Sequence, residues 1–292
     1  MDLHTITNVF RDTGKVLLDD WEKLTDIATE KENREGASSV LHADWIAERA
    51  YVPLLSQLWP GVPVLCEEAG TSGVADLIPG VSILDHEDNV TDLPSTFMSA
   101  DGVDGSALYA NGVFTLVSMM AGLVKDGKPQ ASVLMVLGEK EIYHTGINGK
   151  PGVFYGERSY EEWRLPIRPL KQSLIGTDDN KSVDANFRRL VITKLLGSDG
   201  TRYPLNVPSG SGALSVLKGN LAAYVTSNAR NWDLVATAAL CNAAGLIVRC
   251  LDGSEVPWNV VRMPPVVFAR DEETFAYVQD VAKDWLLTER GI

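Results

Sequence analysis

Cysteine, histidine and positive charge are scarce in this sequence. Its 292 residues include three cysteines and four histidines, and 26 lysines and arginines stand against 39 aspartates and glutamates, for a formal net charge of -13. The cysteines (Cys66, Cys241 and Cys250) make no disulfide framework and lack the spacing of a zinc site, which favours a reducing, cytoplasmic location. A chain this acidic is a poor match for a protein that binds nucleic acid or an anionic membrane.

Long apolar runs and a signal peptide are also missing. The two longest apolar segments, residues 112–124 and 234–248, are interrupted or too short to span a bilayer, and the first residues lack the charged and apolar regions of a signal peptide. Hydrophobic residues make up 45% and charged residues 22%, which is typical of a globular protein and argues against disorder. The length suits one large domain or two of ordinary size.

Apolar spacing and turn residues predict a mixture of helices and strands. Helices are expected over 4–27, 43–58, 210–218, 232–244 and 272–287. Strands are expected over 63–66, 97–100, 113–120, 132–137, 141–145, 190–195, 222–225 and 246–251, and loops over 31–39 and 148–186. Asp126-Gly127 predicts a hairpin turn. The mixture predicts a layered α/β (α+β) architecture, with a soft boundary between an N-terminal half, residues 1–150, and a C-terminal half, residues 151–292.

The most informative segment is Asp101-Gly102-Val103-Asp104-Gly105-Ser106. Two carboxylates this close raise one another's pKa unless a cation lies near them, and Mg²⁺ prefers such oxygen ligands. The glycine lets the backbone approach an anion, and a helix that starts at the serine adds free N–H groups to an anion site. The alternative interpretation is an Asp/Gly-rich turn without chemistry.

Further acids stand at the ends of predicted strands and the starts of predicted helices: Asp44, Glu67, Glu68 and Asp233. Each has a structural alternative, since Asp44 and Asp233 suit helix caps and the glutamates suit an exposed pair. As a set, together with the two aspartates of the 101–106 segment, they can converge on one pocket.

The order of these motifs resembles the inositol monophosphatase-like phosphatases. This family of Mg²⁺-dependent, lithium-sensitive phosphomonoesterases includes the 3′(2′),5′-bisphosphate nucleotidases. The 101–106 segment is similar to the family's Asp-Pro-x-Asp-Gly-Thr/Ser signature, and Trp232-Asp233 with its Ala-rich helix is similar to a second signature. The resemblance spans about residues 44–252, and it implies an α-β-α-β-α sandwich of two packed halves with the metal site between them.

The resemblance also implies an activity. The chain would hydrolyse a small soluble phosphate ester, with two or three Mg²⁺ ions that neutralise the phosphate and lower the pKa of the attacking water. Inositol or cyclitol phosphates, sugar phosphates and 3′(2′),5′-bisphosphate nucleotides are the candidate substrates, and a homodimer is expected. No cysteine, histidine or serine nucleophile is required.

The resemblance assigns metal ligands residue by residue. Glu67 and Asp101 would bind the first Mg²⁺, with the carbonyl oxygen of Val103 as an additional ligand. Asp101, Asp104 and Asp233 would bind the second ion. Glu67 would also orient and activate the attacking water, together with the serine of the motif.

A second group of residues would handle water and phosphate. Ser106 and Asp44 would help to place the water, and Asp44 would support the metal cluster. The backbone N–H groups of Gly105 and Ser106 would hold the phosphate. Ser211 and Gly212 would line the substrate side of the site.

Five positions depart from the family pattern. Gly102 stands where the signature has proline, Leu41 where the family has threonine, and Cys66 where glycine is common. Thr226 stands at the position of the acid that recognises the sugar ring, and Ala243 at the position of a glutamate. The residues that the resemblance implies as metal ligands are present, whereas those that it implies for substrate recognition are replaced. The substrate therefore stays open.

Other interpretations also stay open. Arg230 and Arg249 suit either recognition of a second phosphate or plain surface charge. The chain as a whole could be a non-catalytic relative that binds metal and phosphate as a regulator or scaffold. It could also be a general α/β domain whose acids are helix caps and surface charges.

Overall fold

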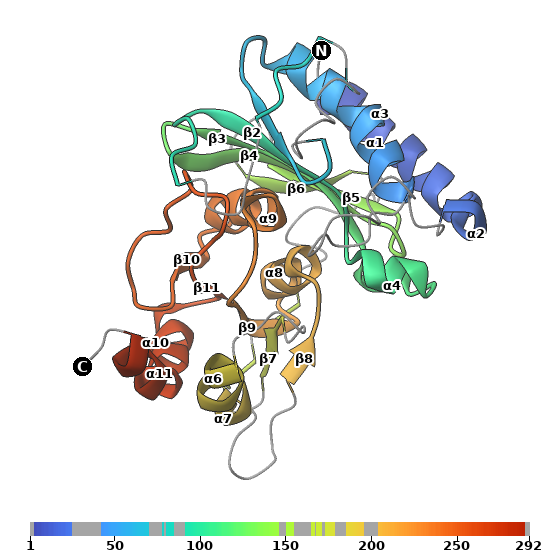
Figure 1. Ribbon diagram of the computed structural model, residues 1–292. Helices are drawn as coiled ribbons and strands as arrows, with labels where there is room; N and C mark the ends of the chain where they lie inside the picture. Colours follow the sequence, from blue (N-terminus) through green and yellow to red (C-terminus); the bar gives the residue numbers. More distant parts are fainter. Residues whose placement is uncertain are drawn as a thin grey trace.

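In the computed structural model, the N-terminal helices form an outer layer. The structure describes residues 3–24, 42–69, 78, 80–84, 91–145, 150–154, 165–166, 168–170, 173–178, 185–195 and 204–289. Helices α1 (Leu3–Asp19), α2 (Trp21–Leu24) and α3 (His42–Leu58) form the outer layer, and α1 lies beside α3 (Figure 1). Both long helices were expected from apolar spacing; the predicted loop over 31–39 and Leu41 lie outside the described residues.

The first sheet lies under this layer. Its strands are β1 (Val64–Cys66), β2 (Phe97–Asp104), β3 (Ser118–Lys125), β4 (Lys128–Val136), β5 (Glu141–Thr145) and β6 (Pro151–Phe154), in that order across the sheet. Strand β1 pairs parallel to β2, and the remaining neighbours are antiparallel. The predicted hairpin is confirmed: φ is 53° at Asp126 and 73° at Gly127, the left-handed values of a type I′ turn.

Two differences from the expected strands occur in this sheet. The strand expected over 113–120 begins only at Ser118, because Phe114–Leu116 form the short 3-10 turn η3. Strand β6 was not expected, since it falls in a segment rich in loop signals.

Three helices lie beyond the first sheet. Helix α4 (Ser106–Ala110) is short, while α8 (Ser209–Lys218) and α9 (Asn231–Ala243) form a central layer. Helix α9 contacts β2, β3 and β4 on one side and β10 (Ile247–Cys250) on the other. Residues on every side of α9 are therefore buried, which explains its run of small and apolar side chains.

The second sheet follows, in the strand order β10-β11-β9-β7-β8. Its further strands are β7 (Leu174–Thr177), β8 (Pro204–Asn206), β9 (Leu221–Thr226) and β11 (Val266–Ala269). Strand β7 pairs parallel to both β8 and β9, and β11 pairs antiparallel to β9 and β10. The second outer layer consists of α6 (Ala185–Phe187), the π-helical turn η5 (Arg188–Ile192), α7 (Thr193–Leu195), α10 (Glu272–Val281) and α11 (Lys283–Glu289).

The strand predicted over 190–195 is wrong, because these residues are helical. Phe187, Val191 and Leu195 recur at a spacing of four, and all three are buried in one apolar cluster with Trp285 of α11. β-branched residues in this segment favoured a strand, and packing against α11 overrides that preference.

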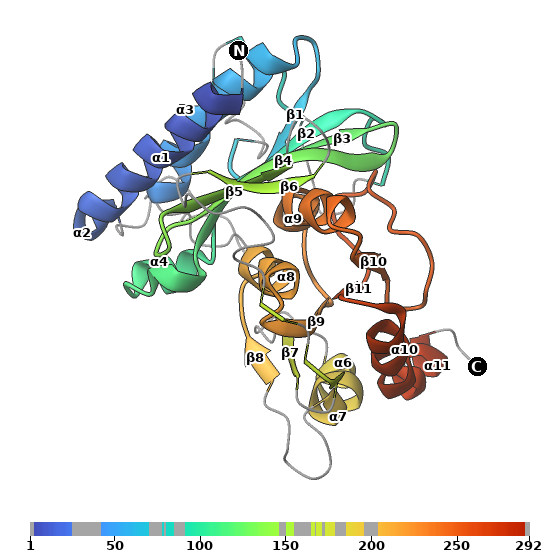
Figure 2. The same ribbon diagram turned by 180° about the vertical axis from the view of Figure 1, so that it is seen from behind.

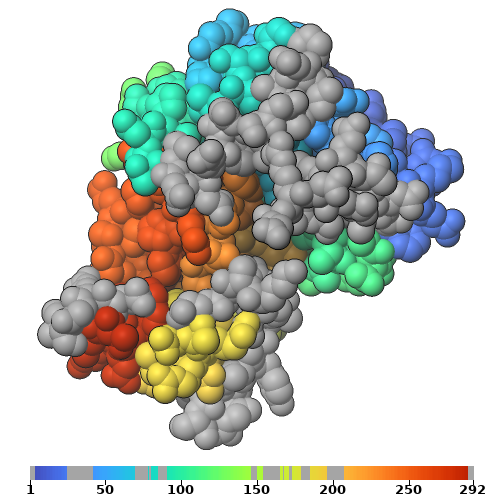
Figure 3. Space-filling view, in the orientation of Figure 1, coloured from blue at the N-terminus to red at the C-terminus, as the bar shows by residue number. Residues whose placement is uncertain are grey.

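The layers thus alternate helix, sheet, helix, sheet, helix, as Figures 1 and 2 show from opposite sides, and the expected α-β-α-β-α sandwich is confirmed. The space-filling view shows the colours of the N-terminal residues in the upper part and those of the C-terminal residues below (Figure 3). The division at residue 150 stays a prediction; β6 belongs to the first sheet. Within the described residues, every helix is too short or too polar for a membrane span.

Candidate metal centre

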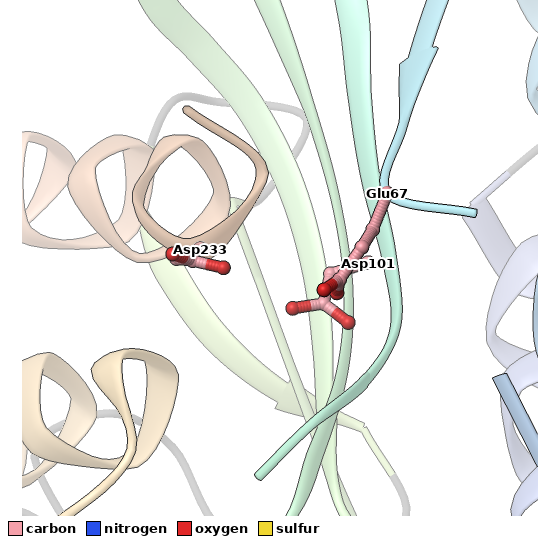
Figure 4. Close-up of side chains that lie close together, drawn as sticks. All are labelled: Glu67, Asp101 and Asp233. Carbon is pink, nitrogen blue, oxygen red and sulfur yellow. The ribbon is translucent and has the colours of Figure 1, made fainter. Parts of the chain in front are cut away.

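Three carboxylates from two layers converge at one point. Glu67, Asp101 and Asp233 each have an oxygen within 4.8 Å of the oxygens of the other two (Figure 4). Glu67 follows β1, and the parallel pairing of Cys66 with Ala100 places it beside Asp101. Asp233 comes from the first turn of α9, on the other side of the site.

Asp101 has the most demanding environment of the three. Its side chain is 1% exposed, and neither carboxylate oxygen has a hydrogen-bond partner among the residues that the structure describes. Burial, and then the negative charges of Glu67, Asp104 and Asp233, raise its pKa well above the usual range. A buried, unpaired charge is costly unless a cation compensates it, and hard divalent cations take oxygen ligands. The residues present therefore fit a magnesium ion.

Asp104 lies near the same cluster because β2 is irregular. Asp101 pairs with Met120 and Asp104 with Ser118, so the two residues between them on β2 lie opposite a single residue on β3. The Asp104 carboxylate accepts hydrogen bonds from the Gly210 N–H at 2.8 Å and from the Ser118 hydroxyl at 3.3 Å. Burial and the charge of Asp233 still raise its pKa to about 8.

Asp233 has a structural contact in addition to its place in the cluster. Its Oδ2 accepts the backbone N–H of Arg230 at 2.5 Å, as part of a capping box at the start of α9. Burial raises its pKa to about 6, against the opposing effects of the Arg230 N–H and guanidinium. The cap and the metal ligand were separate interpretations of this residue, and the geometry is compatible with both.

Asp44 and Gly102 bring α3 against the acidic segment. Asp44 is 2% exposed, and a Cβ at Gly102 would lie 2.5 Å from the Asp44 carbonyl oxygen. The glycine at the proline position of the signature thus permits a close helix approach. The Ser106 hydroxyl is 2.9 Å from the Val103 carbonyl oxygen and 3.4 Å from Asp44 Oδ1, so it lies between these two groups.

Gly105 makes the turn from β2 into α4. Its φ is 92°, a left-handed value that suits glycine, and a Cβ there would lie 2.9 Å from Cγ of Pro208. Helix α4 begins at Ser106, as expected from the sequence.

The residues expected on the substrate side contribute to the packing of α8. The Ser211 hydroxyl donates to the Leu116 carbonyl at 2.7 Å, and Ser211 lines a cavity of about 310 Å³ between α8 and the first sheet. Gly212 packs against the Tyr224 ring, where a Cβ would lie 2.2 Å from a ring carbon. The contact from α8 to the acids comes instead from Gly210, whose N–H reaches Asp104.

The two candidate arginines differ in their contacts. The Arg249 guanidinium binds the Glu272 carboxylate through two hydrogen bonds at 2.7 and 3.0 Å, on the exposed surface. An Arg230 guanidinium nitrogen donates to the Asn228 carbonyl at 3.2 Å, close to the start of α9.

Two buried acids near the cluster were not predicted from the sequence. Glu48 on α3 accepts the backbone N–H groups of Glu68 and Ala69. Asp178 follows β7 and accepts the Thr226 hydroxyl at 2.6 Å, and burial raises its pKa to about 7. Asp178 carries only a weak signal in the sequence, because β7 itself was not expected. The helical period places Glu48 one turn after Asp44 on the same helix face, but it does not show that the carboxylate contacts the turn after Glu67.

The class that the fold and site define is a layered α-β-α-β-α sandwich with a cluster of carboxylates between its layers. The model of the inositol monophosphatase family matches residues 2–284, so the chain belongs to that family. Searches of curated proteins gave no significant sequence match.

Solved structures share the fold at low sequence identity. The chain is similar to an IMPase from Thermotoga maritima, with 17% identity over 97% of this chain and 98% of that one and a TM-score of 0.71. It is similar to the extragenic suppressor protein SuhB from Bartonella henselae, with 17% identity, 96% and 98% coverage and a TM-score of 0.74. An IMPase/NADP phosphatase solved with Mg²⁺ and phosphate gives 17% identity, 96% and 95% coverage and a TM-score of 0.69.

Proposed function

We propose that this chain is a Mg²⁺-dependent phosphomonoesterase that hydrolyses a small soluble phosphate ester. Membership of the inositol monophosphatase family supports a phosphatase role. The observation that carries the proposal is the buried Asp101 carboxylate, which has no hydrogen-bond partner in the described part of the chain and lies beside Glu67 and Asp233. A fold relative that contains Mg²⁺ and phosphate supports the same chemistry.

The ligand assignment follows the expected one. Glu67, Asp101 and the Val103 carbonyl would hold the first ion, and Asp101, Asp104 and Asp233 would hold the second. The convergence of Glu67, Asp101 and Asp233 supports this assignment, and a total of two or three ions is part of the proposal. Mg²⁺ supplies positive charge and Lewis acidity to the phosphate ester and to the water.

The chain's own groups orient the reactants. Glu67 would accept a proton from the attacking water as the water oxygen bonds to phosphorus and the ester P–O bond breaks, and the leaving alkoxide would take a proton from solvent water. The Ser106 hydroxyl, which lies between Val103 and Asp44, would fix the position of the attacking water. The N–H groups of Gly105 and Ser106 hold the phosphate at the turn into α4. Ser211 and Gly212 line the substrate side. Because positioning and charge stabilisation dominate phosphoryl transfer, these roles need no covalent nucleophile.

The names of the fold relatives support a small phosphate ester as substrate. Structures of the Staphylococcus aureus IMPase-II are described with inositol monophosphate and with 2′-AMP, and the IMPase/NADP phosphatase with NADP and Ca²⁺. On the family resemblance, the proposed substrate is a cyclitol phosphate, a sugar phosphate or a 3′(2′),5′-bisphosphate nucleotide. We also propose, on the family resemblance alone, that the protein is a homodimer and that it is cytoplasmic.

Phosphate release tests the proposal. The panel contains myo-inositol 1-phosphate, 2′-AMP, NADP, 3′-phosphoadenosine 5′-phosphate and fructose 1,6-bisphosphate, each with Mg²⁺ or with a chelator. We expect Mg²⁺-dependent release from at least one ester and none from Asp101→Asn. Tight Mg²⁺ binding without turnover of any ester would instead favour the non-catalytic relative.

A further inference from the structure

One face of helix α3 contacts both segments that carry the candidate ligands. Asp44, Glu48 and Tyr51 recur at intervals of four and three residues, so they share a face of the helix, and all three are buried. Asp44 contacts the segment that contains Gly102. The Tyr51 hydroxyl donates to the Asp101 carbonyl at 2.6 Å. Glu48 contacts the turn that follows Glu67.

The contact made by Glu48 uses both oxygens of its carboxylate. Oε1 accepts the backbone N–H of Glu68 at 3.0 Å, and Oε2 accepts that of Ala69 at 2.9 Å. Glu48 is completely buried. Burying a carboxylate charge costs free energy, and hydrogen bonds from the two backbone N–H groups offset part of that cost.

These two amides come directly after Glu67 in the chain. On its other side, the Glu67 N–H donates to the Ala100 carbonyl of β2 at 3.3 Å. The backbone of Glu67 is therefore fixed before and after its Cα: by the strand that carries Asp101, and by Glu48 on α3. A fixed backbone limits the directions in which the Glu67 side chain can point.

We propose that Glu48 is a positioning residue for the metal centre, which holds the turn at residues 67–69 so that the Glu67 carboxylate faces Asp101. This inference rests on the proposed function, because it assigns Glu48 a task only if Glu67 binds Mg²⁺. Groups that orient a metal ligand typically change metal affinity about 10–100-fold when they are removed.

The test is Glu48→Gln, with Mg²⁺ binding measured by isothermal titration calorimetry on the full chain at pH 8.5, because burial raises the pKa of Glu48 to about 8 and the comparison needs the ionised carboxylate. Glutamine has the same shape but a single acceptor oxygen, so its NH₂ group would face one of the two backbone N–H donors. We expect Mg²⁺ to bind about 10–100-fold more weakly. Leu55→Ala is the matched control: Leu55 is buried on the same helix, and its truncation lowers the melting temperature but removes no side-chain hydrogen bond, because leucine has none to give.

A double-mutant cycle shows whether the effect passes through Glu67. Glu67→Gln lowers Mg²⁺ affinity by itself, and adding Glu48→Gln then has little further effect, within about twofold, if Glu48 acts by orienting Glu67. Additive losses in the double variant would overturn the proposal. If Glu48→Gln does not fold, Glu48→Asp takes its place, since the shorter side chain reaches only one amide and the same direction is expected.

The outcomes separate this inference from the proposed function. Wild-type protein that binds no Mg²⁺ would overturn both the metal centre and the role of Glu48. Wild-type binding with unchanged affinity in Glu48→Gln would overturn only the positioning role. A loss of affinity that Leu55→Ala reproduces would show a general effect of helix stability and would equally contradict the proposal.

Discussion

At the residue scale, the Asp101 carboxylate is buried among other acids, and its two oxygens have no hydrogen-bond donor among the described residues. Burial raises its pKa well above the usual range, so folding of the metal-free protein near neutral pH must either protonate this carboxylate or bury its charge, and both oppose folding. We expect Asp101→Asn to increase the free energy of unfolding of the metal-free protein, by about 1–3 kcal/mol, because asparagine is neutral in both the folded and the unfolded chain. The same variant should lose Mg²⁺-dependent phosphate release. Urea unfolding in a chelator and a phosphate assay measure the two effects.

Asp92→Asn is the control for this prediction. Asp92 is exposed, so the substitution removes one negative charge without changing a buried group. Stability and activity should both stay close to wild type. A stability gain in Asp92→Asn equal to that in Asp101→Asn would attribute the effect to net charge and contradict the role of burial.

Residue-scale contacts also decide what could be predicted from the sequence. The cluster that contains Asp101 could be proposed because its acids lie in short motifs with a recognisable order. Glu48 and Asp178 could not, because their partners are backbone amides and a hydroxyl that lie 20 to 48 residues away. Such contacts leave no local pattern, so they appear only when the helices and strands are placed in space.

At the scale of elements, the approach of α3 to β2 depends on Gly102. A Cβ at this position would meet the Asp44 carbonyl oxygen at 2.5 Å, a backbone atom that can move only with the start of the helix. Gly102→Ala should therefore displace the first turn of α3, lower stability by about 1–3 kcal/mol and weaken Mg²⁺ binding. Thermal unfolding with and without Mg²⁺ measures both changes.

Gly127→Ala provides the comparison. Gly127 has a φ of 73°, and an added Cβ would meet no atom of the described residues within 4 Å, so alanine there costs about 1–2 kcal/mol of backbone strain in the β3–β4 turn. It should destabilise the protein while leaving the Mg²⁺ response intact. Equal loss of the Mg²⁺ response in both variants would mean that general destabilisation, and not helix approach, sets the metal affinity.

Elements were predictable where local signals agree with packing. The β3–β4 hairpin has an Asp-Gly turn between apolar runs, and α9 has an apolar run with an acid in its first turn. The helical segment over 188–195 was missed because β-branched residues hide its four-residue spacing. Strands β7, β8 and β11 are three or four residues long, too short to show a period of two.

At the scale of the whole molecule, the candidate ligands come from two layers. Glu67 and Asp101 belong to the first sheet, and Asp233 belongs to α9, which also contacts the second sheet. Mg²⁺ that bridges them should stabilise the folded chain as a unit, by about 3 kcal/mol at an ion concentration one hundred times the Kd. Asp233→Asn should largely remove this stabilisation, as measured by melting temperature over a Mg²⁺ titration. An undiminished shift in Asp233→Asn would place the ion within the first sheet alone.

The buried acids also predict how the stability of the whole protein depends on pH. Burial is the main cause that raises the pKa of Asp104 and Glu48 to about 8, of Asp178 to about 7 and of Asp233 to about 6. Between about pH 4 and pH 8 the metal-free folded chain therefore holds more protons than the unfolded chain, and its free energy of unfolding falls as pH rises. The stabilisation that these acids contribute is fully present below their pKa values in the unfolded chain. It is lost as the pH rises through their pKa values in the folded chain.

Mg²⁺ should change this dependence only in part. Bound ions favour the charged forms of Asp104 and Asp233, so these two residues no longer contribute to the decline of the free energy of unfolding with pH. Glu48 and Asp178 are not assigned as ligands, so their contribution to the decline remains. Urea unfolding at intervals from pH 5 to pH 8.5 should thus give a steep decline in chelator and a shallower one in saturating Mg²⁺. Asp178→Asn should remove part of the remaining slope, because a neutral side chain at that buried position has no proton to lose. A metal-free stability that is flat or rises over this range would show that the acids are already charged in the folded chain, and that the cluster is compensated without a cation.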